Sequence, residues 1–125
     1  MDVEGRGRPR APITGAAAAD YLADDHVLHW VAEDAGVVVG HLLCYLQRRR
    51  AGEPRQLMLY EIGVRDDRRR QGIGRALMSE MDEWMRANGV STVWVLADNE
   101  EAEAFYAACG FSRDKPQPVQ MSRRR

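Results

Sequence analysis

Residues 61–77 read Glu-Ile-Gly-Val-Arg-Asp-Asp-Arg-Arg-Arg-Gln-Gly-Ile-Gly-Arg-Ala-Leu, and this segment decides the fold. The apolar run that ends at Val64 predicts a strand, the arginines after it predict a turn, and Gly72 and Gly74 open an amphipathic helix. The first N–H groups of such a helix have no partner within it, and the helix dipole is positive at this end. Because glycine has no Cβ, a bulky anion can approach the backbone there. The segment therefore predicts a binding site for a diphosphate.

Two other kinds of phosphate-binding loop do not fit these residues. A Walker loop ends in Gly-Lys-Ser/Thr, whereas Arg75 follows Gly74 and the single lysine of the chain is Lys115. A dinucleotide fingerprint needs a third glycine, and Leu77 stands at that position. The pattern Arg/Gln-x-x-Gly-x-Gly/Ala fits instead, as Arg69-Arg70-Gln71-Gly72-Ile73-Gly74. With its flanking strand and helix, this segment resembles the acetyl-coenzyme A loop of the GNAT N-acetyltransferase superfamily. The structural alternative is a helix that begins with glycines beside solvated arginines.

The composition is that of one ordinary globular domain. The 125 residues are 45% hydrophobic and 30% charged, which is enough to build a core. The net charge of −1 disfavours nucleic-acid binding, although arginines cluster at 48–50, 68–70 and 123–125. The sequence shows no apolar run of membrane-spanning length and no signal-peptide pattern, so we expect a cytoplasmic protein with no membrane partner. Cys44 and Cys109 match no metal or redox spacing and are expected to be reduced.

The order of the predicted elements indicates an α+β fold. We expect a flexible tail over residues 1–12 and a single acetyltransferase domain over residues 13–125. The pattern predicts helices at 16–22, from Ile73 to a stop at Asn88-Gly89, and at 100–109; strands at 26–32, 37–47, 57–64, 91–97 and 119–122; and a hairpin turn at 33–36. The strand at 91–97 is almost continuously apolar, as expected of a strand covered on both faces. The fold class is a GNAT-like mixed, mostly antiparallel sheet flanked by helices, without the usual N-terminal strand and helix.

Within the superfamily, residues 21–111 are most similar to the small aminoglycoside 3-N-acetyltransferases. The similarity is carried by Tyr21-Leu22, Val37-Val38-Val39-Gly40, Leu43-Cys44-Tyr45-Leu46, Leu59-Tyr60-Glu61-Ile62-Gly63-Val64, the arginine-glycine loop and Val95-Leu96-Ala97-Asp98. It implies direct transfer of an acetyl group from acetyl-coenzyme A to the 3-amino group of a deoxystreptamine ring, an antibiotic-resistance activity. It also implies that the acceptor is a small polycationic amine and that no metal is needed.

The resemblance implies a particular set of residues for the acetyl donor. The pyrophosphate would lie on residues 70–75, the pantetheine along residues 62–64 and beside Asn99, and the sulfur near Tyr106. The full set implied to bind acetyl-coenzyme A is Ile62, Gly63, Val64, Arg69, Arg70, Gln71, Gly72, Ile73, Gly74, Arg75, Asn99 and Tyr106.

Three residues are candidates for proton transfer. Glu61 lies within an apolar strand, where a carboxylate is costly unless it is wet or paired. It is either the general base, acting directly or through water, or the salt-bridge partner of a nearby arginine. Tyr106 is either the acid that protonates the leaving thiolate or a core tyrosine with a satisfied hydroxyl. The resemblance leaves Asp98 as the alternative acceptor of the amine's proton.

Other features leave the acceptor open. Asp98, Glu100, Glu101 and Glu103 either complement the dipole of the last helix or attract a polycation. Family members normally begin with a strand and a long helix that help to wall the acceptor site, whereas here about twenty poorly patterned residues precede Tyr21. This leaves three alternatives. The acceptor site is unusually open to solvent, a partner subunit supplies its missing wall, or the sequence is a fragment that lacks the elements forming that wall. Other acceptors are a protein N-terminus, a polyamine or a small metabolite, and a coenzyme A-binding module without turnover is a further alternative. We expect a homodimer, because the sheet would leave an edge that a second chain could cover.

Overall fold

The computed structural model describes residues 2–4, 20–21 and 23–125. These residues form one five-stranded sheet in the order β1-β2-β3-β4-β5. The strands are β1 (Asp2–Glu4), β2 (Val27–Asp34), β3 (Val37–Gln47), β4 (Gln56–Val64) and β5 (Val93–Val95). The strands pair antiparallel except for β4 and β5, which are parallel. The predicted mixed, mostly antiparallel sheet is confirmed.

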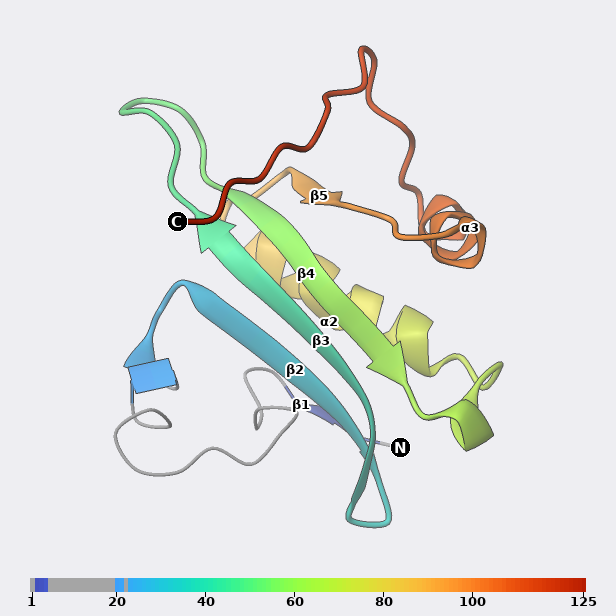
Figure 1. Cartoon of the computed structure of the whole chain (residues 1–125). Coiled ribbons are helices and arrows are strands. Elements are labelled where there is room, and N and C mark those ends of the chain that lie inside the picture. Colours follow the sequence, from blue (N-terminus) through green and yellow to red (C-terminus); the bar gives the residue numbers. More distant parts are fainter. Residues whose placement is uncertain (1, 5–19, 22) are drawn as a thin grey trace.

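Within the described residues, the helical elements that follow β4 are η1 (Asp66–Arg68), α2 (Ile73–Ala87) and α3 (Glu100–Ala108). Figure 1 shows α2 behind β3 and β4, while α3 stands beside the sheet at the end of the segment that follows β5. Helix α2 also contacts β2 on the same face of the sheet. The core lies between α2 and the sheet; its buried side chains include Leu28, Trp30, Leu42, Cys44, Leu59, Leu77 and Met81. They recur every second residue along the strands and every third or fourth residue along α2. The opposite face of the central strands faces the viewer in Figure 1.

The hairpin between β2 and β3 follows the sequence closely. β3 has the predicted bounds, Val37–Gln47, whereas β2 continues to Asp34, two residues further than expected. The turn is therefore the two-residue Ala35-Gly36, and both residues have positive φ, 52° and 80°. A two-residue turn with this backbone matches the twist of paired strands, which explains why the strands extend to its edges.

Two predictions about the C-terminal half are wrong. The expected strand at 119–122 does not form, and Val119 and Met121 are 83% and 88% exposed, so their alternating pattern buries nothing. The strand expected at 91–97 is only β5, and it is half-buried at an edge of the sheet rather than covered on both faces. Its pairing with β4 stops at Leu59 and Val95. Strand β4 itself continues to Val64, so β5 ends because the chain after Val95 leaves β4 and makes no further ladder with it.

The N-terminal predictions are only partly within the described residues. Residues 2–4 of the segment expected to be a tail form β1, which pairs with β2 at residues 31–33. A strand at the edge of a sheet can form through backbone hydrogen bonds alone, without alternating apolar side chains. The sequence of such a strand therefore gives little indication that it will form. Most of the helix expected at 16–22 lies outside the described residues, and within it Asp20 and Tyr21 are helical. In the part of the chain that the structure describes, no helix has the length and apolar character needed to cross a membrane.

Candidate active site

The segment between β4 and α2 forms an open helix N-terminus. Arg70 and Gly72 both have left-handed backbone conformations, with φ of 65° and 80°. Gly72 is the N-cap residue of α2, and no side chain caps the helix there. The first hydrogen bond across this end joins the N–H of Ala76 to the carbonyl of Gly72. The N–H groups of the first turn are thus left for an anion, which the helix dipole also favours.

A cavity of about 620 Å³ opens over this helix end. The residues around it are Ile62, Gly63, Val64, Arg68, Arg69, Arg70, Gly72, Ile73, Gly74, Arg75, Asn99, Glu101, Ala102, Phe105 and Tyr106. The structure therefore brings together every residue expected to bind the acetyl donor except Gln71, which is exposed and does not line the cavity. Sequence reasoning missed Arg68 and also Glu101, Ala102 and Phe105. Of the last three, Ala102 lies four residues before Tyr106 on α3, so helical periodicity around Tyr106 could have found it, whereas Glu101 and Phe105 do not share that spacing.

The two glycines of the loop differ in what they do. A Cβ on Gly72 would meet nothing within 4 Å, so the space beside this position is open, and glycine is favoured there by the positive φ rather than by a close contact. A Cβ on Gly74 would lie 2.9 Å from Cζ of Phe105. From the sequence, both glycines were expected to have the same role, access of an anion to the backbone. The structure gives Gly74 a packing role as well, because it lets the ring of Phe105 on α3 approach the first turn of α2.

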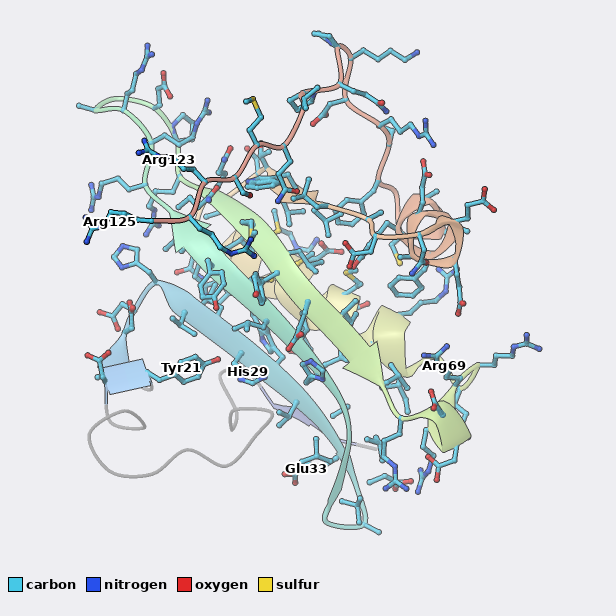
Figure 2. All side chains as sticks on the ribbon, viewed as in Figure 1. Tyr21, His29, Glu33, Arg69, Arg123 and Arg125 are labelled. Atoms are coloured by element: carbon cyan, nitrogen blue, oxygen red, sulfur yellow. The ribbon has the colours of Figure 1, made fainter. Side chains whose placement is uncertain are left out.

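The arginines around the cavity fall into two groups. Arg68 pairs with Asp34, which lowers the pKa of that carboxyl group through the hydrogen bond and the guanidinium charge. Arg69 lies on the segment that follows β4 (Figure 2) and contacts Glu101 on α3, with Nη1 to Oε1 at 3.1 Å. Arg70 and Arg75 make no ion pair with any residue that the structure describes. Their charge is available to a bound anion.

Tyr106 lines the cavity and is buried, with its ring against Phe105 and Phe111. Burial raises the pKa of Tyr106, and the negative charge of Asp98 raises it further. The phenol therefore stays protonated at neutral pH, which is the state that a proton donor needs. Asp98 itself is exposed and does not line the cavity, so its clearest contact with the site is this electrostatic one.

The polar residues in the first turn of α3 mainly stabilise the helix and its packing. Asn99 is the N-cap residue, and its Oδ1 accepts a hydrogen bond from the N–H of Ala102 at 2.8 Å. Of the acidic residues around it, Glu101 pairs with Arg69 and Glu103 pairs with Arg113. These pairs and the dipole of α3 account for much of the acidic patch without a polycation.

Glu61 lies on β4 beside the cavity residues but does not line the cavity. The register between β3 and β4 shifts next to Glu61: Leu43 faces Glu61, and the next residue, Cys44, faces Leu59, which leaves Tyr60 as an extra residue. The bulge turns the carboxylate to the sheet face opposite α2, where Oε1 lies 3.1 Å from Nε2 of His41. Sequence reasoning expected an arginine as the partner of Glu61 in a structural role, and it gave His41 no part in the site.

The described residues contain no group of three or more histidine, cysteine or carboxylate side chains that could hold a metal ion. Both cysteines are free thiols, and burial raises the pKa of Cys44 to about 12.

Residues 4–111 match the model of the Acetyltransferase (GNAT) family, and the chain belongs to this family. A solved aminoglycoside acetyltransferase from an uncultured soil metagenomic sample superposes with a TM-score of 0.79 at 23% identity and covers 92% of this chain and 77% of its own. A second such enzyme, also from a soil metagenomic sample, gives a TM-score of 0.75 at 27% identity, with 93% of this chain and 77% of its own.

The curated relatives include an acetyltransferase that acts on a ribosomal protein. The ribosomal protein bS18-alanine N-acetyltransferase of Escherichia coli strain K12 is 41% identical over 56 residues, which are 43% of this chain and 38% of the relative. The chain spans less than half the length of the curated relatives that it matches.

Proposed function

We propose that this protein is an acetyl-coenzyme A-dependent N-acetyltransferase. The observation that carries the proposal is the cavity that joins the uncapped N-terminus of α2 to the end of β4 and to Tyr106. A diphosphate fits the first of these because it would accept hydrogen bonds from the open N–H groups beside Arg70 and Arg75. Ile62, Gly63 and Val64 would hold the pantetheine arm along β4.

We assign a separate role in the acetyl transfer to each of three residues. The bound thioester supplies an activated acetyl group. Glu61 takes a proton from the ammonium of the acceptor, directly or through water, so that the amine nitrogen carries a lone pair. Tyr106 gives its phenolic proton to the sulfur that leaves. Asp98, exposed at the end of the β5–α3 segment, is the alternative base.

For the acceptor we propose a small polycationic amine, namely the 3-amino group of an aminoglycoside. This is supported by the similarity to two solved aminoglycoside acetyltransferases and by the carboxylate of Glu61, which would attract an ammonium group. The first of these enzymes has also been solved with sisomicin. The choice of the 3-amino group comes from the sequence resemblance alone, and a 6′-acting enzyme is also a structural neighbour.

A second candidate is acetylation of a protein N-terminus. It is favoured by the 41% identity to the bS18-alanine N-acetyltransferase, although this match covers less than half of the chain. A coenzyme A-binding module without turnover is the remaining alternative.

The experiment measures thiol release from acetyl-coenzyme A with sisomicin, with an alanine-initiated peptide and with spermidine, each at equal concentration. We expect the highest kcat/KM with sisomicin, and product analysis by NMR would show which amine is acetylated. The greatest turnover with the peptide would support the second candidate instead. Binding of coenzyme A without thiol release for any of the three would indicate a non-catalytic module.

A further inference from the structure

His41 is a buried histidine whose side chain contacts the carboxylate proposed as the base. Its Nε2 lies 3.1 Å from Oε1 of Glu61, and the two side chains are 10% and 36% exposed. The two residues come from neighbouring strands, β3 and β4, on the sheet face opposite α2. A ring nitrogen at this distance donates a hydrogen bond to an ionised carboxylate, which limits the directions in which that carboxylate can point.

Gly63 makes the room that the imidazole ring needs. It is the residue of β4 directly opposite His41, and a Cβ on it would lie 2.6 Å from Cε1 of that ring. The ring therefore lies over the backbone of β4 where any other residue would displace it. Gly63 also lines the cavity, so His41 is held at the strand that separates the cavity from the opposite face of the sheet.

The other side of the ring is held by His29. The centroids of the two imidazoles are 6.0 Å apart, with an angle of 78° between the ring planes. Nδ1 of His29 lies 3.2 Å from the hydroxyl of Tyr21, and Figure 2 shows these two side chains pointing toward one another across the near face of the sheet. Burial lowers the pKa of His29, and His41 lowers it further, so His29 is neutral at neutral pH. A neutral neighbour restrains the ring of His41 without adding a cation that would compete for Glu61.

We propose that His41 is a positioning residue for Glu61, one that fixes the carboxylate toward the acceptor ammonium. The inference rests on the proposed N-acetyltransferase function and assigns His41, which is not in the cavity, a specific part in it. The observations that carry it are the contact with Glu61, the room made by Gly63 and the packing of His29 behind the ring.

The transfer that this arrangement serves is balanced in atoms and charge. The carboxylate of Glu61 takes one proton from R–NH3+, and the nitrogen bonds to the acetyl carbon. The nitrogen then carries two hydrogens and releases one of them to water as a proton, and the carbon–sulfur bond breaks with its electrons going to sulfur. Tyr106 protonates the thiolate and is reprotonated from water, and Glu61 returns its proton to solvent. The products are the amide, coenzyme A and one proton. His41 stays protonated at Nε2 throughout, because it only donates a hydrogen bond.

The kinetic test compares His41→Ala, His41→Gln, Glu61→Gln and the His41→Ala/Glu61→Gln double variant. We expect His41→Ala to lower kcat about tenfold or more while the KM for acetyl-coenzyme A changes less than about twofold. Glutamine can place an amide N–H close to the position of Nε2, so His41→Gln should recover much of the lost kcat. The double variant should be no slower than Glu61→Gln, because His41 acts through Glu61. His26→Gln is the matched control, since the side chain of His26 is exposed and its ring lies beside the carboxylate of Asp24, not beside Glu61.

Additive losses in the double variant, or failure of His41→Gln to exceed His41→Ala, would overturn the inference. If the wild-type protein releases no thiol with any acceptor, the proposed function fails. The contact between His41 and Glu61 is then tested separately, by NMR of the imidazole nitrogens. Glu61→Gln should shift the Nε2 resonance of His41 and leave that of His26 unchanged. An unchanged His41 resonance would overturn the positioning independently of turnover.

Discussion

At the scale of single residues, the left-handed backbone of Gly72 and the open space beside it determine what a substitution does. Asparagine and aspartate both tolerate this backbone conformation and have similar size, but only aspartate adds a negative charge where the diphosphate is proposed to bind. We expect Gly72→Asp to weaken binding of coenzyme A by about tenfold or more, and Gly72→Asn to weaken it much less. Isothermal titration calorimetry measures both dissociation constants. Equal affinities for the two variants would argue against an anion at this position.

A substitution at Gly74 would not give the same information. Any Cβ there would be forced against Phe105, so lost binding could come from displacement of α3 rather than from charge. The sequence analysis could not separate the two glycines, because the partner of Gly74 lies thirty-one positions further along the chain.

Replacement of Tyr106 tests its proposed role as the acid that protonates the leaving thiolate. Replacement by phenylalanine keeps the packing against Phe105 and Phe111 and removes only the hydroxyl. Because the raised pKa keeps the phenol protonated at neutral pH, we expect Tyr106→Phe to lower kcat by about tenfold or more while the dissociation constant of coenzyme A stays nearly the same. Steady-state thiol release and calorimetry check the two halves of this expectation. Wild-type kcat in the variant would remove Tyr106 as the donor.

At the scale of elements, α3 carries a carboxylate that competes for a cavity arginine. Glu101 holds Arg69 with a contact of 3.1 Å, and both side chains are largely exposed. Glu101→Gln removes this charge and leaves Arg69 paired only with Asp66 among the described residues, at 3.3 Å, so it should lower the dissociation constant of coenzyme A by at most about threefold. Glu103→Gln is the matched control on the same helix, because Glu103 binds Arg113 instead. Calorimetry at low and high salt checks the effect, which should shrink as salt screens the charges. A larger gain in affinity for Glu103→Gln would contradict this role of Glu101.

His29, on β2, makes the free energy of unfolding depend on pH, because the folded protein buries its imidazole ring. Burial lowers the pKa of His29 below the value of about 6.5 expected in the unfolded chain. The unfolded state therefore binds the proton more readily, and the free energy of unfolding should fall as the pH drops below about 6.5. His29→Gln removes this titration, so its stability should fall less than that of the wild type between about pH 7.5 and about pH 5.5. Urea unfolding at both values checks this, and an equal loss in the two proteins would contradict it.

Predictability differed between elements for a physical reason. The hairpin partner β3 and helix α2 follow from local periodicity, and both form where expected. The length of β5 depends on where the chain after Val95 leaves β4, and the strand β1 depends on an open edge of β2. The cavity residues on β4 and α2 were predictable because one continuous segment supplies them. The contact of His41 with Glu61 was not, since it depends on the register of two strands and on a bulge at Tyr60.

At the scale of the whole molecule, the open edge at β5 is the feature most suited to a second copy of the chain. β5 is the last strand of the sheet on that side, and Leu96, directly after it, is 50% exposed. Pairing of two such edges would cover the unpaired backbone groups and the apolar side chains together. We therefore propose a homodimer, which should elute in size-exclusion chromatography with light scattering at twice the 14.1 kDa mass of one chain. Leu96→Glu should produce the monomer, whereas Val38→Glu, at an exposed valine beside the β2–β3 turn, should leave the dimer intact. A wild-type mass of one chain would exclude the dimer, and dissociation by Val38→Glu alone would move the interface to the hairpin.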